Sequence, residues 1–350
     1  MENDYVKGRG SQINPHNPFL KQEYTIEHIE GVDEAITNDG KTELFFEHPK
    51  KIVSITNSPD LGPMHSINPY QGCEHGCIYC YARNSHQYWG FSAGLDFERK
   101  IIIKPNASEL LEKYLLKLKE TPTPIVLSGN TDCYQPMERK LKLTRNLLKI
   151  LAKYRHPVSI ITKNSLILRD LDILRDLASD QLVHVYQSIT SLNESLRRIL
   201  EPRTASAAKK LQVMQKLTTA GVPVGVMTAP IIPGLNEHEI PKLIEQVAAN
   251  GAQTVGYTIV RLNGSIGKLF KDWLFKNFPD RAQKVWHKIE VCHGGNVNDS
   301  QWFRRNRGEG PIAEAIGQLF KASVKRYMPE RTMPEHNLTK FRMGGNLSLF

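Results

Sequence analysis

The stretch GCEHGCIYCYAR, residues 72–83, holds three of the chain's five cysteines within eight positions. Cys73, Cys77 and Cys80 stand at offsets of four and three residues, so their sulfurs converge only where the backbone wraps around a common centre. The two glycines of the stretch permit such a turn, because glycine adopts backbone angles that other residues avoid. An odd number of clustered cysteines does not fit a disulfide framework, and the spacing therefore indicates a shared metal or cluster.

Two kinds of ligand fit three clustered cysteines. A structural zinc ion takes four ligands, and the fourth would come from His75, His86, Cys133 or Cys292. A [4Fe-4S] cluster normally takes four cysteines, and with three it leaves one iron free to bind a small molecule that carries an amine and a carboxylate. The paired CxxC knuckles of zinc modules are missing, since the sequence has no second CxxC. The sequence therefore favours the iron-sulfur cluster, and zinc is the alternative.

Composition indicates an ordinary globular protein. The chain has 350 residues, of which 40% are hydrophobic and 23% charged, enough for one large domain or two smaller ones. No apolar run approaches the roughly 18 to 20 residues that a membrane-spanning helix needs. The polar start lacks the apolar segment of a secretory signal, and clustered cysteines suit metal binding in a reducing compartment. We expect a cytoplasmic protein without a membrane partner.

The formal net charge of +10 favours an anionic partner such as nucleic acid. The segment SQWFRRNRGEGP, residues 300–311, interleaves two aromatic residues with three arginines, a combination suited to stacking bases and neutralising phosphates. These residues are Trp302, Phe303, Arg304, Arg305 and Arg307. A basic loop that caps the core, and solvated faces on amphipathic helices elsewhere, are the structural alternatives.

From about residue 100, short apolar runs alternate with amphipathic runs of helical period. The expected strands are 100–104, 124–129, 157–162, 182–190, 222–232 and 252–260, with a first short strand near 65–70. The expected helices are 106–120, with Asn106 and Glu109 as a capping pair, and 137–155, 165–179, 191–200, 205–221 and 238–251. This alternation predicts an α/β fold with a parallel sheet. About six strands are enough for an open partial barrel but not for a closed eight-stranded one, and a doubly wound sheet is the alternative.

The same pattern predicts three regions along the chain. Residues 1–60 have few periodic apolar positions and are expected to form an irregular N-terminal arm. Residues 61–262 carry the alternating pattern and form the core. Residues 263–350 are expected to form a helical C-terminal extension that packs on the core or covers its open side.

The stretch CEHGCIYC resembles the CxxxCxxC signature of the radical S-adenosylmethionine (radical SAM) superfamily. The longer string NPYQGCEHGCIYCYAR, residues 68–83, resembles more narrowly the branch related to spore photoproduct lyase, and the resemblance runs through about residues 60–262. It implies a partial (βα)6 barrel of the TIM type with the cluster loop after its first strand. Cys73, Cys77 and Cys80 would then ligate a [4Fe-4S] cluster, and S-adenosylmethionine (SAM) would bind the fourth iron.

The resemblance implies an activity as well as a fold. In this family the reduced cluster cleaves SAM to methionine and a 5′-deoxyadenosyl radical, which abstracts hydrogen from a substrate. We therefore expect a lyase-like enzyme served by an electron donor such as flavodoxin or ferredoxin, with nucleic acid as the substrate class that the charge favours. A non-catalytic nucleic-acid-binding protein, stabilised by a metal cluster or by zinc, is the competing hypothesis.

The resemblance further assigns the SAM contacts to the carboxyl ends of the strands. The segment expected around the methionine amino group consists of Ser128, Gly129, Asn130, Thr131 and Asp132. The other expected contacts are Lys163 and Arg203 at the carboxylate, Ser188 or Thr190 at the ribose, and Tyr79 near the adenine. Plain loop residues, surface ion pairs and a core aromatic side chain are the alternatives. His75 is expected beside the cluster ligands rather than among them.

One position departs from the spore photoproduct lyases. Their hydrogen-donor cysteine precedes the second-strand acid by three residues, and Gly129 occupies that position here. Cys133 follows the acid and is the candidate hydrogen donor, with a small buried core residue as the alternative. Repair of the DNA photoproduct is therefore not expected. Tyr134, Gln135 and Glu138 are expected where a substrate would meet the barrel mouth.

Overall fold

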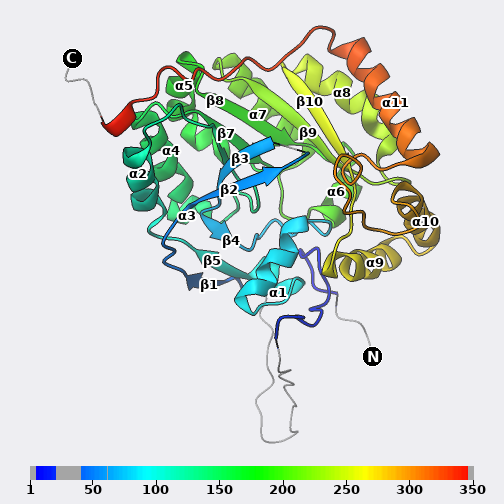
Figure 1. The fold of residues 1–350 in the computed structure, drawn as a ribbon. Coiled ribbons are helices and arrows are strands. Elements are labelled where there is room, and N and C mark those ends of the chain that lie inside the picture. Colours follow the sequence, from blue (N-terminus) through cyan, green and yellow to red (C-terminus); the bar gives the residue numbers. More distant parts are fainter. Residues whose placement is uncertain (1–4, 21–40, 61, 346–350) are drawn as a thin grey trace, which may run out of the picture.

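The computed structural model describes residues 5–20, 41–60 and 62–345 (Figure 1). Its main sheet has seven strands in the order β10-β9-β8-β7-β6-β3-β2. Six of them run parallel: β3 (Gly62–Ile67), β6 (Ile125–Leu127), β7 (Val158–Thr162), β8 (Val183–Ser188), β9 (Val224–Ile231) and β10 (Thr254–Ile259). The predicted partial barrel of six β/α units is confirmed, and the doubly wound alternative is excluded.

The seventh strand, β2 (Val53–Ser58), pairs antiparallel with β3 at the edge of the sheet. It belongs to the region that the sequence assigns to the N-terminal arm. The edge strands β2 and β10 do not pair with each other, so the sheet forms an open half-barrel.

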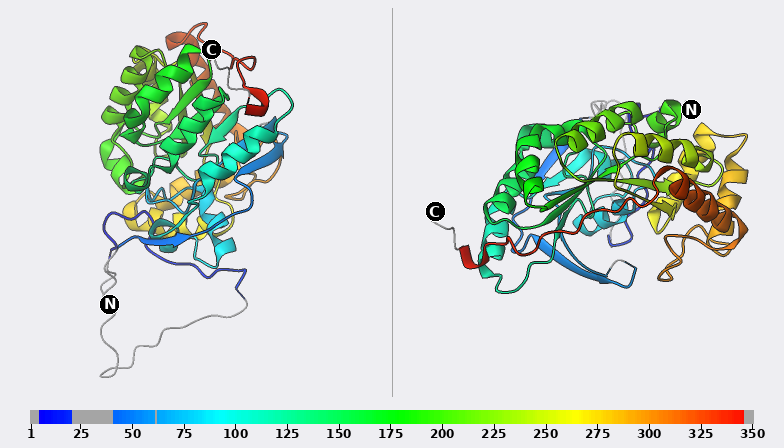
Figure 2. Two further views of the ribbon diagram at one scale, coloured as in Figure 1. Left: turned by 90° about the vertical axis from the view of Figure 1, so that its left-hand side faces the viewer. Right: turned by 90° about the horizontal axis from the view of Figure 1, so that it is seen from above.

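Helices cover the convex face of the sheet (Figure 2). They are α2 (Ala107–Lys117), α4 (Leu143–Lys153), α5 (Leu171–Ser179), α6 (Glu194–Leu200), α7 (Ala207–Thr219) and α8 (Ile240–Ala249). Alternate strand residues such as Val158, Ile160 and Val185 are fully buried in the core on this side. Because strand side chains alternate between faces, the residues between them point to the concave side, which is left free for a site.

The predicted strand at 100–104 forms, but its place in the parallel series is wrong. The strand β5 (Lys100–Ile103) lies in a separate three-stranded sheet with β1 (Glu43–Phe46) and β4 (Tyr70–Gln71). It pairs antiparallel with β4, which leads the chain from β3 into the cysteine stretch, residues 72–83, here called the cluster loop. An apolar β-branched run predicts a strand, but it does not specify which partner that strand will find.

The predicted helix over 137–155 is broken into α3 (Glu138–Leu141) and α4, with Lys142 at φ 55° between them. The buried carboxylate of Glu138 accepts a hydrogen bond of 3.1 Å from the backbone N–H of Thr144 in the first turn of α4. This contact satisfies one of the N–H groups that a helix start leaves open. The capping pair predicted at Asn106 does not form, because its side chain donates to the carbonyl of Pro49 instead.

The predicted C-terminal helical extension consists of α9 (Ser265–Asn277), α10 (Ala282–Cys292) and α11 (Gly310–Tyr327). Side chains of α9 such as Phe270 and Trp273 pack in one apolar cluster with Ile78 of the cluster loop. Beyond α11 the chain crosses the amino ends of the strands, where His336 stacks on His184 with ring centroids 3.7 Å apart. Among the described helices, none combines the length and apolar character that crossing a bilayer requires.

A pair of strand glycines tests how tightly the concave face is packed. A Cβ at Gly225 in β9 would lie 2.7 Å from the ring of Tyr186 and 2.9 Å from Thr254, closer than side chains approach. Gly225→Ala should lower the free energy of unfolding by about 1–3 kcal/mol through overpacking. Gly256→Ala in β10 is the matched control, since its nearest contact would be an ordinary 3.4 Å to Met227. Urea unfolding that gave equal losses for both variants would contradict this account.

Candidate active site

A cavity of about 330 Å³ opens at the carboxyl ends of the parallel strands. One wall is the cluster loop, with Cys73, Cys77 and Cys80. The facing walls come from the ends of β6 to β10 and include Asn130, Asp132, Ile161, Thr162, Lys163, Ser188, Met227, Ala229 and Thr258. This volume lies at the lower end of the range for small-molecule sites, and parallel barrels build their active sites at this end.

The cluster loop wraps tightly because two of its positions are glycine. Gly72 and Gly76 have φ of 80° and 69°, in the left-handed region. A Cβ at Gly72 would lie 2.8 Å from the carbonyl oxygen of Lys100, and one at Gly76 would lie 2.9 Å from a carboxylate oxygen of Glu98. Both the backbone angle and the lack of space therefore require glycine. The turn that the sequence predicts brings all three cysteines to the cavity wall.

The three thiols are free, and burial raises the pKa of each above its usual value. Buried thiols of this kind need a cation to become thiolates, and a metal ligand is deprotonated outright. Within the described residues, no group of three or more His, Cys, Asp or Glu side chains is placed to hold a single metal ion. The three cysteines that share one cavity wall fit a [4Fe-4S] cluster, in which each cysteine would bind a separate iron.

The four residues considered as a fourth zinc ligand are not arranged for that role. His75 lines the cavity, but its Nδ1 lies 3.3 Å from Asp132 and its Nε2 3.1 Å from the side-chain amide of Asn164. His86, Cys133 and Cys292 do not line the cavity. His75 thus lines the same cavity as the three cysteines, and its ring is engaged with Asp132 and Asn164.

Asp132 ties the ends of two strands to the cluster loop. Its carboxylate accepts hydrogen bonds of 2.8 Å from the Thr162 hydroxyl and from the backbone N–H groups of Lys163 and Tyr134, and it faces His75. Burial alone would raise the pKa of Asp132, but His75 and the two N–H donors outweigh burial and lower it. Because a carboxylate has about four acceptor positions, most of its hydrogen-bonding capacity is already used inside the protein.

The rest of the predicted second-strand segment divides in its contacts. Ser128, Asn130 and Thr131 line the cavity, whereas Gly129 does not. The hydroxyls of Ser128 and Thr131 are engaged with backbone groups. The carbonyl of Gly129 accepts a hydrogen bond from the hydroxyl of Tyr81, the residue that follows the last cysteine. The side-chain nitrogen of Asn130 donates to Gln71 and Ser85, at 3.2 and 3.1 Å, so its Oδ1 is the atom of this side chain that can meet a ligand.

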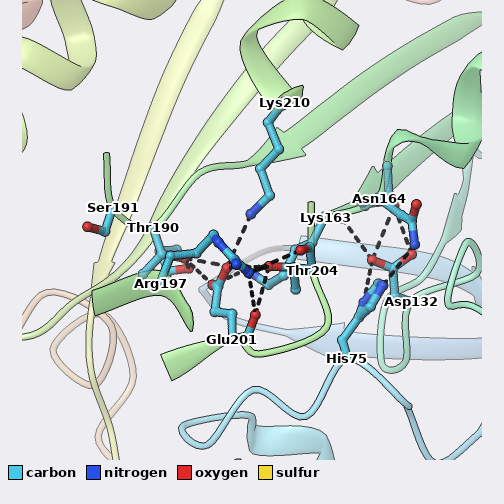
Figure 3. A network of polar contacts seen from close by, with 12 residues as sticks. His75, Asp132, Lys163, Asn164, Thr190, Ser191, Arg197, Glu201, Thr204 and Lys210 are labelled. Atoms are coloured by element: carbon cyan, nitrogen blue, oxygen red, sulfur yellow. Dashed lines mark hydrogen bonds and ion pairs between the residues drawn. The ribbon is translucent and has the colours of Figure 1, made fainter. Parts of the chain in front are cut away.

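A buried ionic network that the sequence did not reveal lies behind the cavity (Figure 3). The Glu201 carboxylate receives the ammonium groups of Lys163 at 3.1 Å and Lys210 at 3.2 Å. It also accepts hydrogen bonds from the hydroxyls of Thr190, at 2.5 Å, and Tyr79. Glu201 and Lys210 carry no motif, and a lysine in an amphipathic helix is usually read as solvated. Only their proximity to Arg203 in the sequence pointed to this region.

Burial and mutual attraction set the charges in this network. Burial alone would raise the pKa of Glu201, but the two lysines outweigh it and hold the pKa well below its usual range. Burial alone would lower the pKa of Lys163, but Glu201 raises it above its usual value. For Lys210, burial wins and lowers the pKa. Lys163 is the charged member of the network that lines the cavity, so it presents a fixed positive charge there.

The remaining predicted SAM contacts separate into two groups. Ser188 and Tyr79 line the cavity, and the ammonium of Lys163 lies 5.6 Å from the centre of the Tyr79 ring. Thr190 lies outside the lining, hydrogen-bonded to Glu201. Arg203 also lies outside, where its guanidinium is 3.8 Å from Glu74. Arg203, predicted to form a fork to the methionine carboxylate, thus lies outside the cavity lining.

Cys133 and the three residues expected at the mouth lie elsewhere. The Cys133 side chain is completely buried in the apolar core, and burial raises the pKa of its thiol. Tyr134, Gln135 and Glu138 are also fully buried and outside the lining. The segment after Asp132 turns back into the core rather than towards the mouth, so the predicted hydrogen donor is not brought to the cavity.

The basic aromatic segment joins the two edges of the half-barrel. The carbonyl of Asn306 accepts a hydrogen bond of 2.9 Å from the N–H of Ile259 in β10. Arg305 forms an ion pair with Asp60 and donates to the Ser58 hydroxyl of β2 at 3.1 Å. Internal ion pairs also engage Arg304. The segment thus closes the open side of the sheet, while Trp302, Phe303 and Arg307 stay exposed. Asn306 and Arg261, which line the cavity, were not predicted.

Three comparisons place this architecture among known proteins. The family model of the radical SAM superfamily matches residues 67–247. An uncharacterised protein of Mycobacterium bovis is 32% identical over 232 residues, 66% of this chain and 68% of the relative. One from Methanocaldococcus jannaschii is 29% identical over 250 residues, 71% of this chain and 89% of the relative.

Among solved structures, a spore photoproduct lyase mutant superposes with a TM-score of 0.60 at 16% identity, covering 86% of each chain. A spore photoproduct lyase complexed with a dinucleoside spore photoproduct gives a TM-score of 0.55 at 14% identity, again over 86% of each chain. These likenesses concern the fold. Together with the family match and the three cysteines on one cavity wall, they show that the chain is an enzyme of the radical SAM superfamily, with the fold of its spore photoproduct lyase branch.

Proposed function

We propose that this protein cleaves SAM reductively and uses the resulting radical to abstract hydrogen from a nucleic acid. The observation that carries the proposal is the convergence of Cys73, Cys77 and Cys80 on one wall of a cavity whose facing wall carries polar groups, Lys163 and Ser188 among them. When bound, a [4Fe-4S] cluster supplies the electron that splits SAM into methionine and a 5′-deoxyadenosyl radical. The superfamily generally uses this cluster and SAM, and the residues present fit both.

The chain's own residues would bind and orient SAM. The ammonium of Lys163, held by Glu201, offers a charge-assisted hydrogen bond to the methionine carboxylate. Asn130 offers its side-chain oxygen to the methionine amino group, and Ser188 offers a hydroxyl to the ribose. The apolar side chains of Met227, Ile161 and Ala229 line the same cavity and exclude water from a radical that would otherwise be quenched.

A nucleic acid is the substrate class with the most support. The net charge is +10, and Phe303, 71% exposed, belongs to the same segment as Asn306, which lines the cavity. An exposed aromatic side chain suits base stacking, and a net positive charge suits phosphate neutralisation. The complex of a spore photoproduct lyase with a dinucleoside supports the same class. The absence of a cysteine at Gly129 sets the reaction apart from photoproduct repair.

The compartment and the electron donor are proposed from the same chemistry. We place the enzyme in the cytoplasm, since free clustered cysteines require a reducing compartment. The electron would come from a small carrier such as flavodoxin or ferredoxin.

The cysteine ligands can be tested one at a time. Anaerobic reconstitution of the wild type should give a brown protein that releases 5′-deoxyadenosine from SAM on reduction. Cys77→Ala should lose both the colour and at least about 99% of the nucleoside release, because the reaction requires the bound cofactor. Cys292→Ala and Cys133→Ala are the controls and should keep both, since neither thiol lines the cavity. A colourless wild type with one zinc per chain would rule out the proposal.

The sequence assigns Lys163 and Arg203 the same role, but only Lys163 lines the cavity. Lys163→Met should weaken SAM binding to the reconstituted protein by about 10- to 100-fold, because a hydrogen bond to a charged group contributes about 1.5–3 kcal/mol. Arg203→Met should stay within about twofold of wild type, because its guanidinium lies outside the cavity. Isothermal titration with SAM measures both values. A larger loss for Arg203→Met than for Lys163→Met would refute this assignment.

The substrate class has its own test. Phe303→Ala should weaken binding of a single-stranded oligonucleotide by about 5- to 100-fold, the loss expected for one stacked base. Phe275→Ala is the matched control, because Phe275 is an exposed phenylalanine of α9 that does not line the cavity. Deuterium carried from a labelled oligonucleotide into 5′-deoxyadenosine would identify the substrate. Binding without deuterium transfer would favour the non-catalytic alternative. Equal affinity of the two variants would show that Phe303 does not stack on a base.

A further inference from the structure

The N-terminal arm packs directly on the outer side of the cluster loop. Residues 5–20 lie beside α1 (Leu95–Arg99), far along the chain from their own position (Figure 1). We call residues 9–17 the strap. The strap lies outside the region that the superfamily model matches, residues 67–247. Its contacts with the loop are therefore a property of this chain's arm rather than of the matched core.

The strap is anchored on a buried carboxylate. The backbone N–H groups of Gly10 and Ser11 donate to the two carboxylate oxygens of Glu98, at 3.1 and 2.8 Å. A guanidinium nitrogen of Arg9 donates to the Glu98 carbonyl at 2.6 Å. The same carboxylate forms an ion pair of 2.6 Å with Arg83, and neither side chain is exposed. The strap and Arg83 thus donate to the same carboxylate, that of Glu98. These donors compensate the buried charge for the water that it has lost.

From this acceptor the contacts continue to the cluster ligands. The Nε of Arg83 donates to the carbonyl of Cys77 at 2.9 Å. The strap also touches the loop itself, because a Cβ at Gly10 would lie 1.8 Å from the carbonyl oxygen of Gly76. Gly76 directly precedes Cys77. The backbone of the strap therefore lies against the part of the loop that sets the position of one cysteine.

The far end of the strap is fixed as well. The side-chain amide of Asn17 donates to the carbonyls of Gln87 and Phe91, at 2.8 and 3.2 Å. The N–H of Leu95 donates to the carbonyl of Ile13 at 3.3 Å. These bonds hold the strap along the segment that follows the third cysteine, so it spans the outer side of the loop.

We propose that the strap is a positioning element of the cluster site: it holds the cysteine loop in its wrapped conformation and so slows the loss of iron from the cluster. This inference rests on the proposed function, since it presupposes a cluster at the three cysteines. The residues act through the loop and do not touch the cofactor. Groups that orient metal ligands in this way typically change metal affinity by about 10- to 100-fold when altered.

Gly10→Ala in the full-length, anaerobically reconstituted protein tests the strap. The added methyl group must displace either the strap or the Gly76 carbonyl, so a chelator should extract iron about tenfold faster than from wild type. Gly8→Ala is the matched control, because a Cβ there meets nothing within 4 Å. The positive φ of Gly8 strains the arm in that control without pushing on the loop. Thermal unfolding of the two metal-free variants separates a specific effect on the cluster from a general loss of stability.

Each outcome decides the inference. Faster iron loss in Gly10→Ala, with Gly8→Ala like wild type and similar unfolding midpoints for both, supports it. Unchanged iron loss, or equal acceleration in both variants, overturns it. Should Gly10→Ala not fold, Asn17→Ala loosens the other end without a clash and must also accelerate iron loss. A wild type that takes up no cluster at all would defeat the proposed function, whereas a stable cluster indifferent to these variants would defeat the strap alone.

Discussion

The site depends on one buried ion pair, between Arg83 and Glu98. Both side chains are fully buried, and their closest atoms are 2.6 Å apart. Arg83 also donates to the carbonyls of Cys77, Ala93 and Gly94, so one guanidinium fixes the backbone on both sides of the last cysteine. Removing one partner of such a pair leaves an uncompensated buried charge, at a cost of about 3–5 kcal/mol. These contacts hold the backbone of the cluster loop in its wrapped conformation.

The barrel strands supply the opposite half of the site, and there too single carboxylates accept hydrogen bonds from several donors. Asp132 joins the end of β6 to the end of β7 and to His75 of the cluster loop. Glu201 gathers two lysines and two hydroxyls behind the cavity. The Glu201 carboxylate is buried and that of Asp132 is 10% exposed, and each is stabilised by several donors from different elements. The polar groups that face the cysteines are thus held in place by the protein itself, and Lys163 stays charged at the cavity surface.

The basic segment near the C-terminus illustrates how one composition can serve two purposes. Arginines alternate with aromatics there, and the sequence could not separate a nucleic-acid surface from a cap on the core. In the fold, Arg304 and Arg305 are used internally, because Asp299 and Asp60 lie within reach. Phe303 and Arg307 remain at the surface. An arginine that pairs with an acid inside the protein is not available to a ligand. The acid can lie nearby in the sequence, as Asp299 does, or far away, as Asp60 does, and sequence spacing does not reveal such pairs.

The sequence alone determined the cysteine loop, the superfamily and the partial barrel, because a local spacing of ligands and the alternation of β and α periods are both readable along the chain. Only the tertiary structure decided which polar residues share the site. In the fold, Arg203 and Cys133 lie outside the cavity lining, whereas Glu201 and Lys210 form an ion pair behind it. It also placed Gly10 against the cluster loop. Burial and hydrogen-bond partners depend on contacts between distant segments, and no local pattern encodes them.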